Sequence, residues 1–521
     1  MNLPLIKRRD LVKGLSLLPL APLLYQGTRS SAAPALPQAT APGPNVLIVV
    51  FDTVSAPHMS LYGYPRQTTP HLDRFAERAT VYHQHYAGGS FTVPGTASLL
   101  TGTYPWSHRA FNQGGTVAQA YEAQNLFGAF ASGGYTNIAY THNLLANSLL
   151  HHFGAAIDLH LNPTAFCLSN GSFADALFPH DADIAARSFD DLILRRGGET
   201  PSSLVLSLLD RVRMGLDKRN VMATHRDSYP QGVPELFKLY FVLEEAIDGL
   251  LATVNAAPHP FLAYFHLLPP HEPYRPRKEF IGRFADQRQP VAKAARFFSQ
   301  GHSDEALNHW SRQYDEFLAY ADTEFGRLVA ALAASGRLDD TIVVFTSDHG
   351  QLFERGIHGH VTPTLYDPVI HVPLLIALPG QQSRTDVYTP TSCVDLLPTL
   401  LHLTGQAVPA WSTGRILPNF STAATNAERA IFAIDAKSNP KQAPLTKATI
   451  MLRKGPYKVT HYAGYPKSQA ETELYDLDND PEERENLATT QPALAADLSQ
   501  ELTAALQEQN QPFLAHKLAR S

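Results

Sequence analysis

Three runs of apolar residues, rich in β-branched and aromatic side chains, constrain the fold of this chain more than any other feature. They cover residues 45–51, 261–268 and 341–345. Uninterrupted apolar runs of this length are typical of strands that are buried on both faces of a parallel sheet. Segments with helical spacing lie between and after them, over 70–79, 117–132, 306–334 and 394–403. This alternation predicts an α/β fold with a doubly wound, mostly parallel sheet flanked by helices.

Two further strand-like runs, 137–141 and 372–377, extend the alternation across residues 44–408. We expect this range to form the main domain. Residues 155–258 fit the pattern poorly, because they are helix-rich around a polar stretch at 218–231. We therefore expect 155–258 to form a helical insertion or lid over the sheet.

The pattern changes again after about residue 408. Short strand-like runs at 429–434, 448–453 and 457–462 precede a helical segment at 490–507. Pro492 suits the first turn of that helix, where its missing N–H costs nothing. These features predict a small α+β subdomain over residues 409–521.

Length and composition fit a soluble globular protein with a sizeable core. The chain has 521 residues, of which 44% are hydrophobic and 17% charged, enough for one large α/β domain with an appendage. The formal net charge is -6, and no Lys- or Arg-rich block lies in the body of the chain. This balance disfavours binding of nucleic acid or of an anionic membrane through a basic face. The sequence gives no indication of the oligomeric state.

The N-terminal segment differs in character from the rest. Lys7-Arg8-Arg9-Asp10-Leu11-Val12-Lys13 precedes a modest apolar stretch at 14–24, and small residues and prolines follow to residue 43. This arrangement resembles a bacterial twin-arginine export signal. The apolar core of about a dozen residues is too short for a stable membrane span. We expect residues 1–43 to be an export signal and linker that directs the protein to the periplasm or the exterior; an amphipathic or disordered N-terminus is the alternative.

The cysteines do not indicate a disulfide framework. The chain holds two cysteines, Cys167 and Cys393, and their spacing does not suggest a disulfide. Cys393 lies in an apolar segment that reads as a buried helical face. We expect two structural thiols.

Polar residues that suit metal chemistry follow two of the predicted strands. Asp52 ends the run at 45–51, and Asp348-His349 follow the run at 341–345. Ligands of open α/β sheets bind beyond the carboxyl ends of the strands, so these side chains are expected to meet there. As the alternative, an Asp at a strand end is often a helix N-cap.

A hydroxyl completes this candidate set. Thr92 begins the helix-like run Thr92-Val93-Pro94-Gly95-Thr96-Ala97-Ser98. Carboxylate, imidazole and hydroxyl ligands suit one divalent ion such as Zn²⁺, Mn²⁺ or Ca²⁺. A hydroxyl beside such an ion loses its proton more readily, which would make Thr92 a nucleophile.

Several histidines stand where they can assist. His271 follows a strand within a proline-rich turn, and His358 and His360 follow Asp348 within a glycine-flanked segment. If a nucleophile at Thr92 attacks a substrate, His271 and His360 suit binding of one of its non-bridging oxygens or donation of a proton to its leaving oxygen. The roles of His142 and His358 stay open. With 23 histidines in the chain, any single one is more often a surface or structural residue.

The order of these motifs resembles the sulfatase family of the alkaline phosphatase superfamily, from Asn45 to about Leu487. The landmarks are residues 45–52, Leu61-Tyr62-Gly63-Tyr64-Pro65, Thr69-Pro70-His71-Leu72-Asp73, residues 92–102 with Tyr104-Pro105, Gly134-Tyr135, Pro270-His271-Glu272-Pro273-Tyr274, Ser347-Asp348-His349-Gly350, His371-Val372-Pro373-Leu374, Asp395-Leu396-Leu397-Pro398-Thr399-Leu400 and Glu473-Leu474-Tyr475-Asp476-Leu477. The resemblance implies that Asp52, Thr92, Asp348 and His349 hold one metal ion. It also implies that Thr92 is the nucleophile and that His271 and His360 contact the ester and its leaving group.

The chain departs from the family pattern at informative positions. Sulfatases carry Cys or Ser at position 92, oxidised to formylglycine, and an Arg where Thr96 stands. The usual pair of acids at the first strand is reduced to Asp52, and a Gly-Lys-Trp-His element after Gly134-Tyr135 is missing. Thr92 cannot become the aldehyde that expels sulfate without a second attack at sulfur. A threonyl ester must be cleaved by water or another acceptor at the central atom, and phosphorus accepts that second attack more readily.

The sequence therefore predicts a metal-dependent, sulfatase-like hydrolase of anionic esters that acts through a covalent Thr92 intermediate. A phosphate ester is favoured over a sulfate ester, with a glycan or lipid conjugate among the candidate substrates. Two alternatives stay open. One is a transferase that passes a phosphoryl-linked group to a glycan or lipid acceptor, as in lipoteichoic acid synthases and phosphoethanolamine transferases. The other is a binding protein that keeps the fold without the chemistry.

Overall fold

The structure is a computed structural model. It describes residues 43–168, 204–236, 239–286, 288–290, 292–422, 428–466 and 472–518. The predicted export signal therefore lies outside the described residues, apart from its last position.

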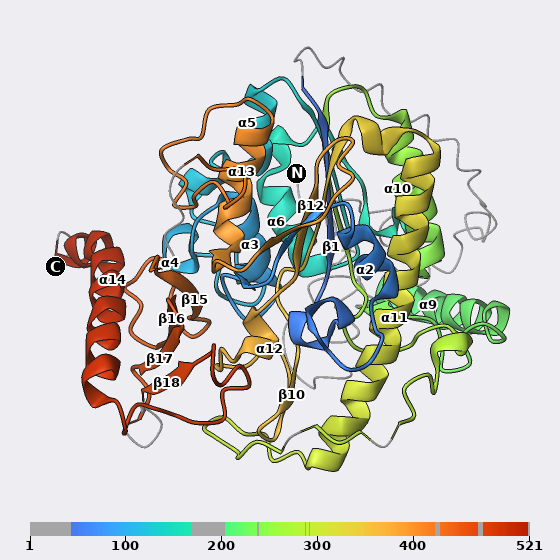
Figure 1. Cartoon of the computed structure of the whole chain (residues 1–521). Helices are drawn as coiled ribbons and strands as arrows, with labels where there is room; N and C mark the ends of the chain where they lie inside the picture. Colours follow the sequence, from blue (N-terminus) through green and yellow to red (C-terminus); the bar gives the residue numbers. More distant parts are fainter. Residues whose placement is uncertain are drawn as a thin grey trace, which may run out of the picture. The chain divides into compact units, whose positions relative to one another are not determined.

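A sheet forms the centre of the fold (Figure 1). It has eight strands, in the order β13-β2-β12-β9-β1-β8-β4-β5. Its strands are β1 (Asn45–Phe51), β2 (Thr80–Tyr82), β4 (Thr136–Thr141), β5 (Leu159–His160), β8 (Phe261–Leu267), β9 (Thr341–Thr346), β12 (Leu374–Ala377) and β13 (Thr385–Val387). Strand β12 runs antiparallel to both of its neighbours, β9 and β2, and the other pairs are parallel. The prediction of a mostly parallel α/β sheet is confirmed.

Helices cover both faces of this sheet (Figure 1). One face carries α2 (Pro70–Ala76), α10 (Leu243–Ala256) and α11 (Asp304–Ala334); the other carries α3 (Thr92–Thr101), α5 (Leu126–Ser132), α6 (Leu144–His152) and α13 (Leu396–Leu403). Successive side chains of a strand point to opposite faces. In β1, accordingly, Val46, Ile48 and Val50 join the core under α3, whereas Leu47 and Val49 join the core under α11.

One predicted helix is shorter than its apolar pattern suggested. The segment 117–132 contains a 3₁₀ turn, η4 (Gln119–Glu122), and only then α5. Helix α5 begins after Asn125, because the side-chain oxygen of Asn125 accepts a hydrogen bond from the N–H of Gly128 at 3.0 Å and so caps the helix. An N-cap of this kind fixes where a helix starts more strongly than apolar spacing does.

The range 155–258 is not simply a lid. It supplies the edge strand β5 and helix α10, whose Leu243, Ile247 and Leu250 are buried against the sheet. Helix α9 (Leu204–Thr224) continues into the polar stretch at 218–231, which was expected to interrupt it. Residues 169–203, also part of the predicted insertion, lie outside the described residues.

The C-terminal segment forms a four-stranded antiparallel sheet and a long helix. The elements are β15 (Ile431–Asp435), β16 (Ala448–Lys454), β17 (Tyr457–Ala463), β18 (Glu473–Asp476) and α14 (Pro492–Leu518). Strand β18 was not predicted. Ile450, Leu452 and Leu502 belong to the same buried cluster as residues of α3 and α13, so this α+β part shares a core with the main sheet.

The described fold also contains short strands and short α-helices. They are β3 (His85–Tyr86), β6 (Glu235–Leu236), β7 (Leu239–Tyr240), β10 (Leu352–Glu354), β11 (Ile357–Gly359), β14 (Thr391–Ser392), α4 (Pro105–His108) and α12 (Asp367–Ile370). Cys167 and Cys393 are both buried, and neither is in a disulfide. Within the described ranges, every helix is too short or too polar to cross a lipid bilayer.

Candidate metal-dependent active site

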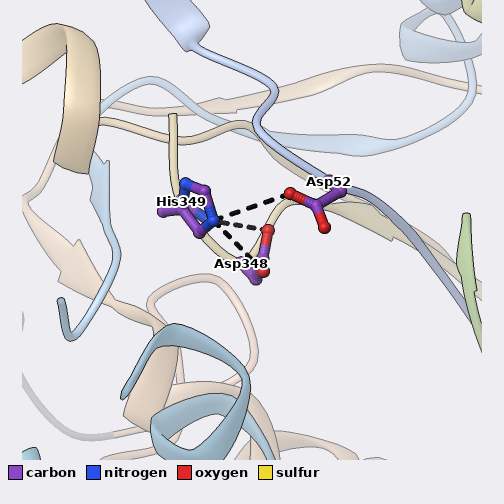
Figure 2. Close-up of side chains that lie close together, drawn as sticks. All are labelled: Asp52, Asp348 and His349. Atoms are coloured by element: carbon purple, nitrogen blue, oxygen red, sulfur yellow. Dashed lines mark hydrogen bonds and ion pairs between the residues drawn. The ribbon is translucent and has the colours of Figure 1, made fainter. Parts of the chain in front are cut away.

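The main sheet brings together the acids and the imidazole that follow two of its strands. Asp52 comes directly after β1, and Asp348 and His349 follow β9. The two strands pair in parallel, with Val50 opposite Thr346, so they end at the same level. Figure 2 shows the three side chains converging, with the ring of His349 directed at both carboxylates.

Three possible ligand atoms lie at equal distances from the ring nitrogen Nε2 of His349, which is itself a possible fourth ligand. Its Nε2 is 3.5 Å from Asp52 Oδ1, 3.5 Å from Asp348 Oδ2 and 3.5 Å from Thr92 Oγ1. Ligands bound tetrahedrally at about 2.1 Å from one zinc-sized ion lie about 3.4 Å apart. The spacing therefore fits a shared cation better than hydrogen bonds, which are shorter.

Unpaired buried atoms in the same place also fit a cation. Asp52 Oδ1 and Asp348 Oδ2 are buried and have no hydrogen-bond partner. His349 Nδ1 lies 2.9 Å from the carbonyl of Gly350; its N–H donates there, which leaves the lone pair of Nε2 free. Buried polar atoms without partners are costly, and a divalent ion would satisfy all three.

The electrostatics of the two carboxyls differ. Burial tends to raise the pKa of Asp52, but the imidazoles of His266, His271 and His349 bring that pKa below its usual value. Burial and the neighbouring Asp52 raise the pKa of Asp348 well above its usual range. Burial lowers the pKa of His349, which keeps its ring neutral. Two buried carboxyls this close need a cation to ionise together.

Thr92 reaches this set because α3 approaches the loop after β9 very closely. Thr92 is the first residue of α3. A Cβ on Gly95, one turn along, would lie only 2.2 Å from the carbonyl oxygen of Asp348, so only glycine allows this approach. The helix N-terminus places the partial positive charge of its free N–H groups beside Thr92, which favours an anionic ligand.

Asn143 is a site residue that the sequence analysis missed. Its Nδ2 donates to Asp52 Oδ2 at 2.7 Å and to Thr92 Oγ1 at 3.1 Å. It therefore connects the candidate nucleophile to a candidate metal ligand. Asn143 follows β4, which is separated from β1 in the sheet by β8. Its place just after a predicted strand was the sequence signal that could have identified it.

His266 is a second residue that the sequence analysis missed. It lies within β8, between β1 and β4, and its side chain is fully buried. Its Nε2 is 3.4 Å from Asp52 Oδ2 and 3.7 Å from Asp348 Oδ2. A histidine inside an apolar run looks like a core residue, so the sequence pattern carried no signal for it.

His271 and His360 lie together beside the candidate metal ligands. Their ring centroids are 4.9 Å apart, and the ring of His360 is 4.5 Å from that of His349. His360 Nδ1 lies 2.7 Å from Gln351 Oε1, and Gln351 Nε2 donates to the hydroxyl of Tyr274. Burial lowers the pKa of His360 well below its usual value. The neutral ring therefore donates from Nδ1 and keeps Nε2 as a proton acceptor.

The two histidines whose roles were left open lie elsewhere. His358 Nε2 is 3.1 Å from the hydroxyl of Tyr274, which connects it to His360 through Gln351. His142 is buried with its ring stacked on Phe241 at 4.2 Å, and neither ring nitrogen has a hydrogen-bond partner. Thr96, at the position of the family's arginine, is fully buried.

Known proteins share the overall arrangement. The choline-sulfatase of Rhizobium meliloti is 24% identical over 474 residues, which cover 85% of this chain and 82% of that protein. A phosphonate monoester hydrolase from Silicibacter pomeroyi superposes with a TM-score of 0.60 at 21% identity, over 89% of this chain and 96% of that chain. A 2-O GAG sulfatase gives 0.62 at 19% identity, over 91% and 94%. These two structures share the fold.

Family profiles cover most of the chain. The one described as "Sulfatase" matches residues 44–210 and 220–406. The one described as "N-sulphoglucosamine sulphohydrolase, C-terminal" matches residues 356–511. The first match alone exceeds half of the chain and includes the residues that converge after β1 and β9. The chain belongs to the sulfatase family and is an ester hydrolase of the alkaline phosphatase-like fold.

Proposed function

We propose that this protein is an exported, metal-dependent hydrolase that cleaves anionic esters through a covalent bond to Thr92, with phosphoryl substrates favoured. The observation that carries the proposal is the position of Thr92 Oγ1. It lies 3.5 Å from His349 Nε2, accepts a hydrogen bond from Asn143 and stands at the N-terminus of α3. A hydroxyl so placed is oriented for attack on an anionic centre.

The residues of the site have separate functions: some would bind the ion, some position Thr92, and some bind the anionic group. Asp52, Asp348, His349 and Thr92 would hold one divalent ion, which lowers the pKa of a neighbouring hydroxyl and offsets the charge of the ester. Asn143 holds Thr92 Oγ1 in position relative to Asp52. The free N–H groups at the start of α3 add to the binding of the anionic group.

A double displacement follows from this arrangement. Thr92 Oγ1 would bond to phosphorus as the bond to the leaving oxygen on the opposite side breaks. The hydroxyl proton is lost to water, and His360 Nε2 relays a proton from water to the leaving oxygen. His271, next to His360, binds a non-bridging oxygen. Water then attacks phosphorus, the bond to Thr92 breaks, and a proton returns to Oγ1.

The preference for phosphorus follows from the chemistry of threonine. A formylglycine can release bound sulfate by collapsing to an aldehyde, whereas a threonyl ester requires a second attack at the central atom. Phosphate esters accept that attack more readily than sulfate esters. Choline-sulfatase and phosphonate monoester hydrolase are among the proteins that this chain resembles, which supports both ester classes as candidates for assay.

The test is a panel of aryl phosphate monoesters, phosphate diesters, phosphonate monoesters and sulfate esters with the metal-loaded protein. We expect hydrolysis of a phosphoryl ester, a loss of at least about a thousandfold in Thr92→Ala, and partial activity in Thr92→Ser, which keeps the hydroxyl. Trapping of a phosphorylated Thr92 peptide by mass spectrometry would identify the intermediate. A clear preference for the sulfate ester, or full activity in Thr92→Ala, would overturn the proposal.

A further inference from the structure

We infer that His266 is a direct ligand of the cation held by Asp52, Asp348 and His349, and that this second imidazole makes the site select a transition-metal ion such as Zn²⁺ or Mn²⁺ over Ca²⁺. The inference rests on the metal dependence in the proposed function. It concerns a residue inside β8 that none of the motifs named in the sequence analysis contains.

The distances separate ligation from hydrogen bonding. A hydrogen bond from an imidazole N–H to a carboxylate is typically about 2.7–2.9 Å long. His266 Nε2 is 3.4 Å from Asp52 Oδ2 and 3.7 Å from Asp348 Oδ2, and it makes no hydrogen bond although it is fully buried. Separations of about 3.4 Å are those of atoms that share one ion. His349 Nε2 stands at 3.5 Å from the same Asp348 oxygen and at 3.5 Å from the other oxygen of Asp52, Oδ1.

The other ring nitrogen of His266 is held as in a ligating histidine. Its Nδ1 lies 3.2 Å from the hydroxyl of Tyr264, two residues earlier in β8. A ligating histidine almost always donates its second N–H to a neighbouring acceptor, which orients the ring. In the tautomer with the proton on Nδ1, Tyr264 is that acceptor, as the carbonyl of Gly350 is for His349. In both rings, Nε2 is then left with a free lone pair.

A second imidazole changes which ion the site prefers. Asp52, Asp348 and Thr92 offer oxygen atoms, and His349 and His266 offer two nitrogen atoms. Ca²⁺ is bound by oxygen ligands and takes six to eight of them. Imidazole suits Zn²⁺ and other first-row transition ions, and carboxylate suits Mn²⁺ as well. A five-residue set with two nitrogen ligands therefore disfavours Ca²⁺.

The experiment compares His266→Phe, which keeps ring volume without a ligand atom, with the wild type. The matched control is His142→Phe, because His142 is a buried histidine nearby whose ring nitrogens contact no candidate ligand. Affinities for Zn²⁺, Mn²⁺ and Ca²⁺ are measured by competition with a chromophoric chelator. We expect His266→Phe to weaken Zn²⁺ binding at least tenfold, with Ca²⁺ binding changed less than threefold and the control unchanged.

X-ray absorption of the zinc-loaded wild type gives a second readout that does not depend on the folding of a variant. We expect two imidazole ligands in the wild type and one in His266→Phe. A single imidazole in the wild type, unchanged Zn²⁺ affinity in His266→Phe, or tighter binding of Ca²⁺ than of Zn²⁺ would overturn the inference. Failure of every ion to bind would instead refute the proposed function, so the two failures are distinguishable.

Discussion

Asn143 connects a local structural role to the chemistry of the site. Its Oδ1 accepts from the N–H of Leu145 at 2.9 Å, so it caps α6. Its Nδ2 donates to Asp52 and to Thr92. Because the cap holds Oδ1 against the start of α6, the amide group cannot rotate, and Nδ2 stays directed at Thr92 Oγ1. The position of Thr92 therefore depends on the start of a different helix.

The two roles of Asn143 can be separated by substitution. Asn143→Ser keeps a good N-cap but loses the amide donor, and we expect kcat/KM to fall about 10- to 100-fold with little change in the free energy of unfolding. Asn143→Ala loses the cap as well and should cost about 1 kcal/mol of stability. Ester hydrolysis and urea unfolding measure the two effects. Undiminished activity in Asn143→Ser would show that Thr92 is held without it.

Position after a strand was the property that made candidate site residues visible in the sequence. Asp52 and the pair Asp348-His349 each end an apolar run, and the structure brings them together after β1 and β9. Asn143 and His266 were missed for physical reasons. An Asn before an apolar helix reads as a cap, and a buried His in a strand reads as core. Only the three-dimensional register places His266 at the carboxylates, whereas the position of Asn143 just after β4 was a signal that could have been used.

Helix α3 depends on Gly95 for its place in the fold. A Cβ at this position would meet the backbone of Asp348, at 2.2 Å from its oxygen and 2.9 Å from its carbonyl carbon. Backbone cannot move away as the end of a flexible side chain can. A methyl group here would push the helix N-terminus, and Thr92 with it, away from the loop after β9.

Gly95→Ala should therefore damage the site more than the fold. A displacement of about 1 Å can cost about a hundredfold in rate, and overpacking costs about 1–3 kcal/mol of stability. The control is Gly215→Ala in α9, where nothing lies within 4 Å of the added Cβ; it should be neutral or slightly stabilising. Kinetics and thermal unfolding of both variants test this. Equal activity in the two would refute the dependence on Gly95.

Strong apolar runs located the central strands well, and short strands escaped detection. The runs at 45–51 and 341–345 became β1 and β9 to within one residue. Strand β18 has four residues and β2 has three, lengths at which periodicity carries little signal. The antiparallel direction of β12 also had no local signal, because strand direction is set by connections and packing rather than by the strand's own residues.

Buried histidines make the stability of the protein depend on pH. Burial, with the charge of Arg109, lowers the pKa of His108 to about 3. His108 Nδ1 accepts from the N–H of Ala110 at 3.0 Å, which fixes the neutral ring. In the unfolded chain this pKa is about 6.5, so between those values only the unfolded state binds the proton. Stability is therefore full above about pH 6.5 and is lost as the pH falls toward 3.

Urea unfolding at several pH values between 7.5 and 5 measures this loss. His108 should contribute a slope of up to about 1.4 kcal/mol per pH unit below its unfolded pKa. His108→Gln, which does not titrate in this range, should flatten the slope. The exposed His402 serves as the control, and His402→Gln should leave the slope unchanged. The same slope in the wild type and in His108→Gln would contradict the assignment.

A buried ion-pair cluster ties the C-terminal sheet to the main domain. Lys458, in β17, is fully buried, and its Nζ lies 2.7 Å from Asp367 Oδ1 and 2.7 Å from Glu483 Oε1. Asp367 begins α12, and Glu483 follows β18. Glu483 also accepts from the backbone N–H of Asp367 at 2.7 Å. Lys458 of the C-terminal sheet thus neutralises Asp367, which lies in the main domain. Separation of the two parts would expose these charges to water or leave them buried without a partner.

Removing only the lysine should destabilise the whole fold, because two buried carboxylates lose their counter-ion. Lys458→Met keeps the length of the side chain, and we expect it to cost about 3–5 kcal/mol. Lys454→Met removes a lysine from the neighbouring strand β16 whose pair with Glu501 is 30% and 38% exposed, and it should cost less than about 1 kcal/mol. Urea unfolding followed by tryptophan fluorescence measures both, and a single transition in the wild type is expected if the two parts unfold together. Equal small losses in the two variants would show that the C-terminal sheet is held by its apolar contacts alone.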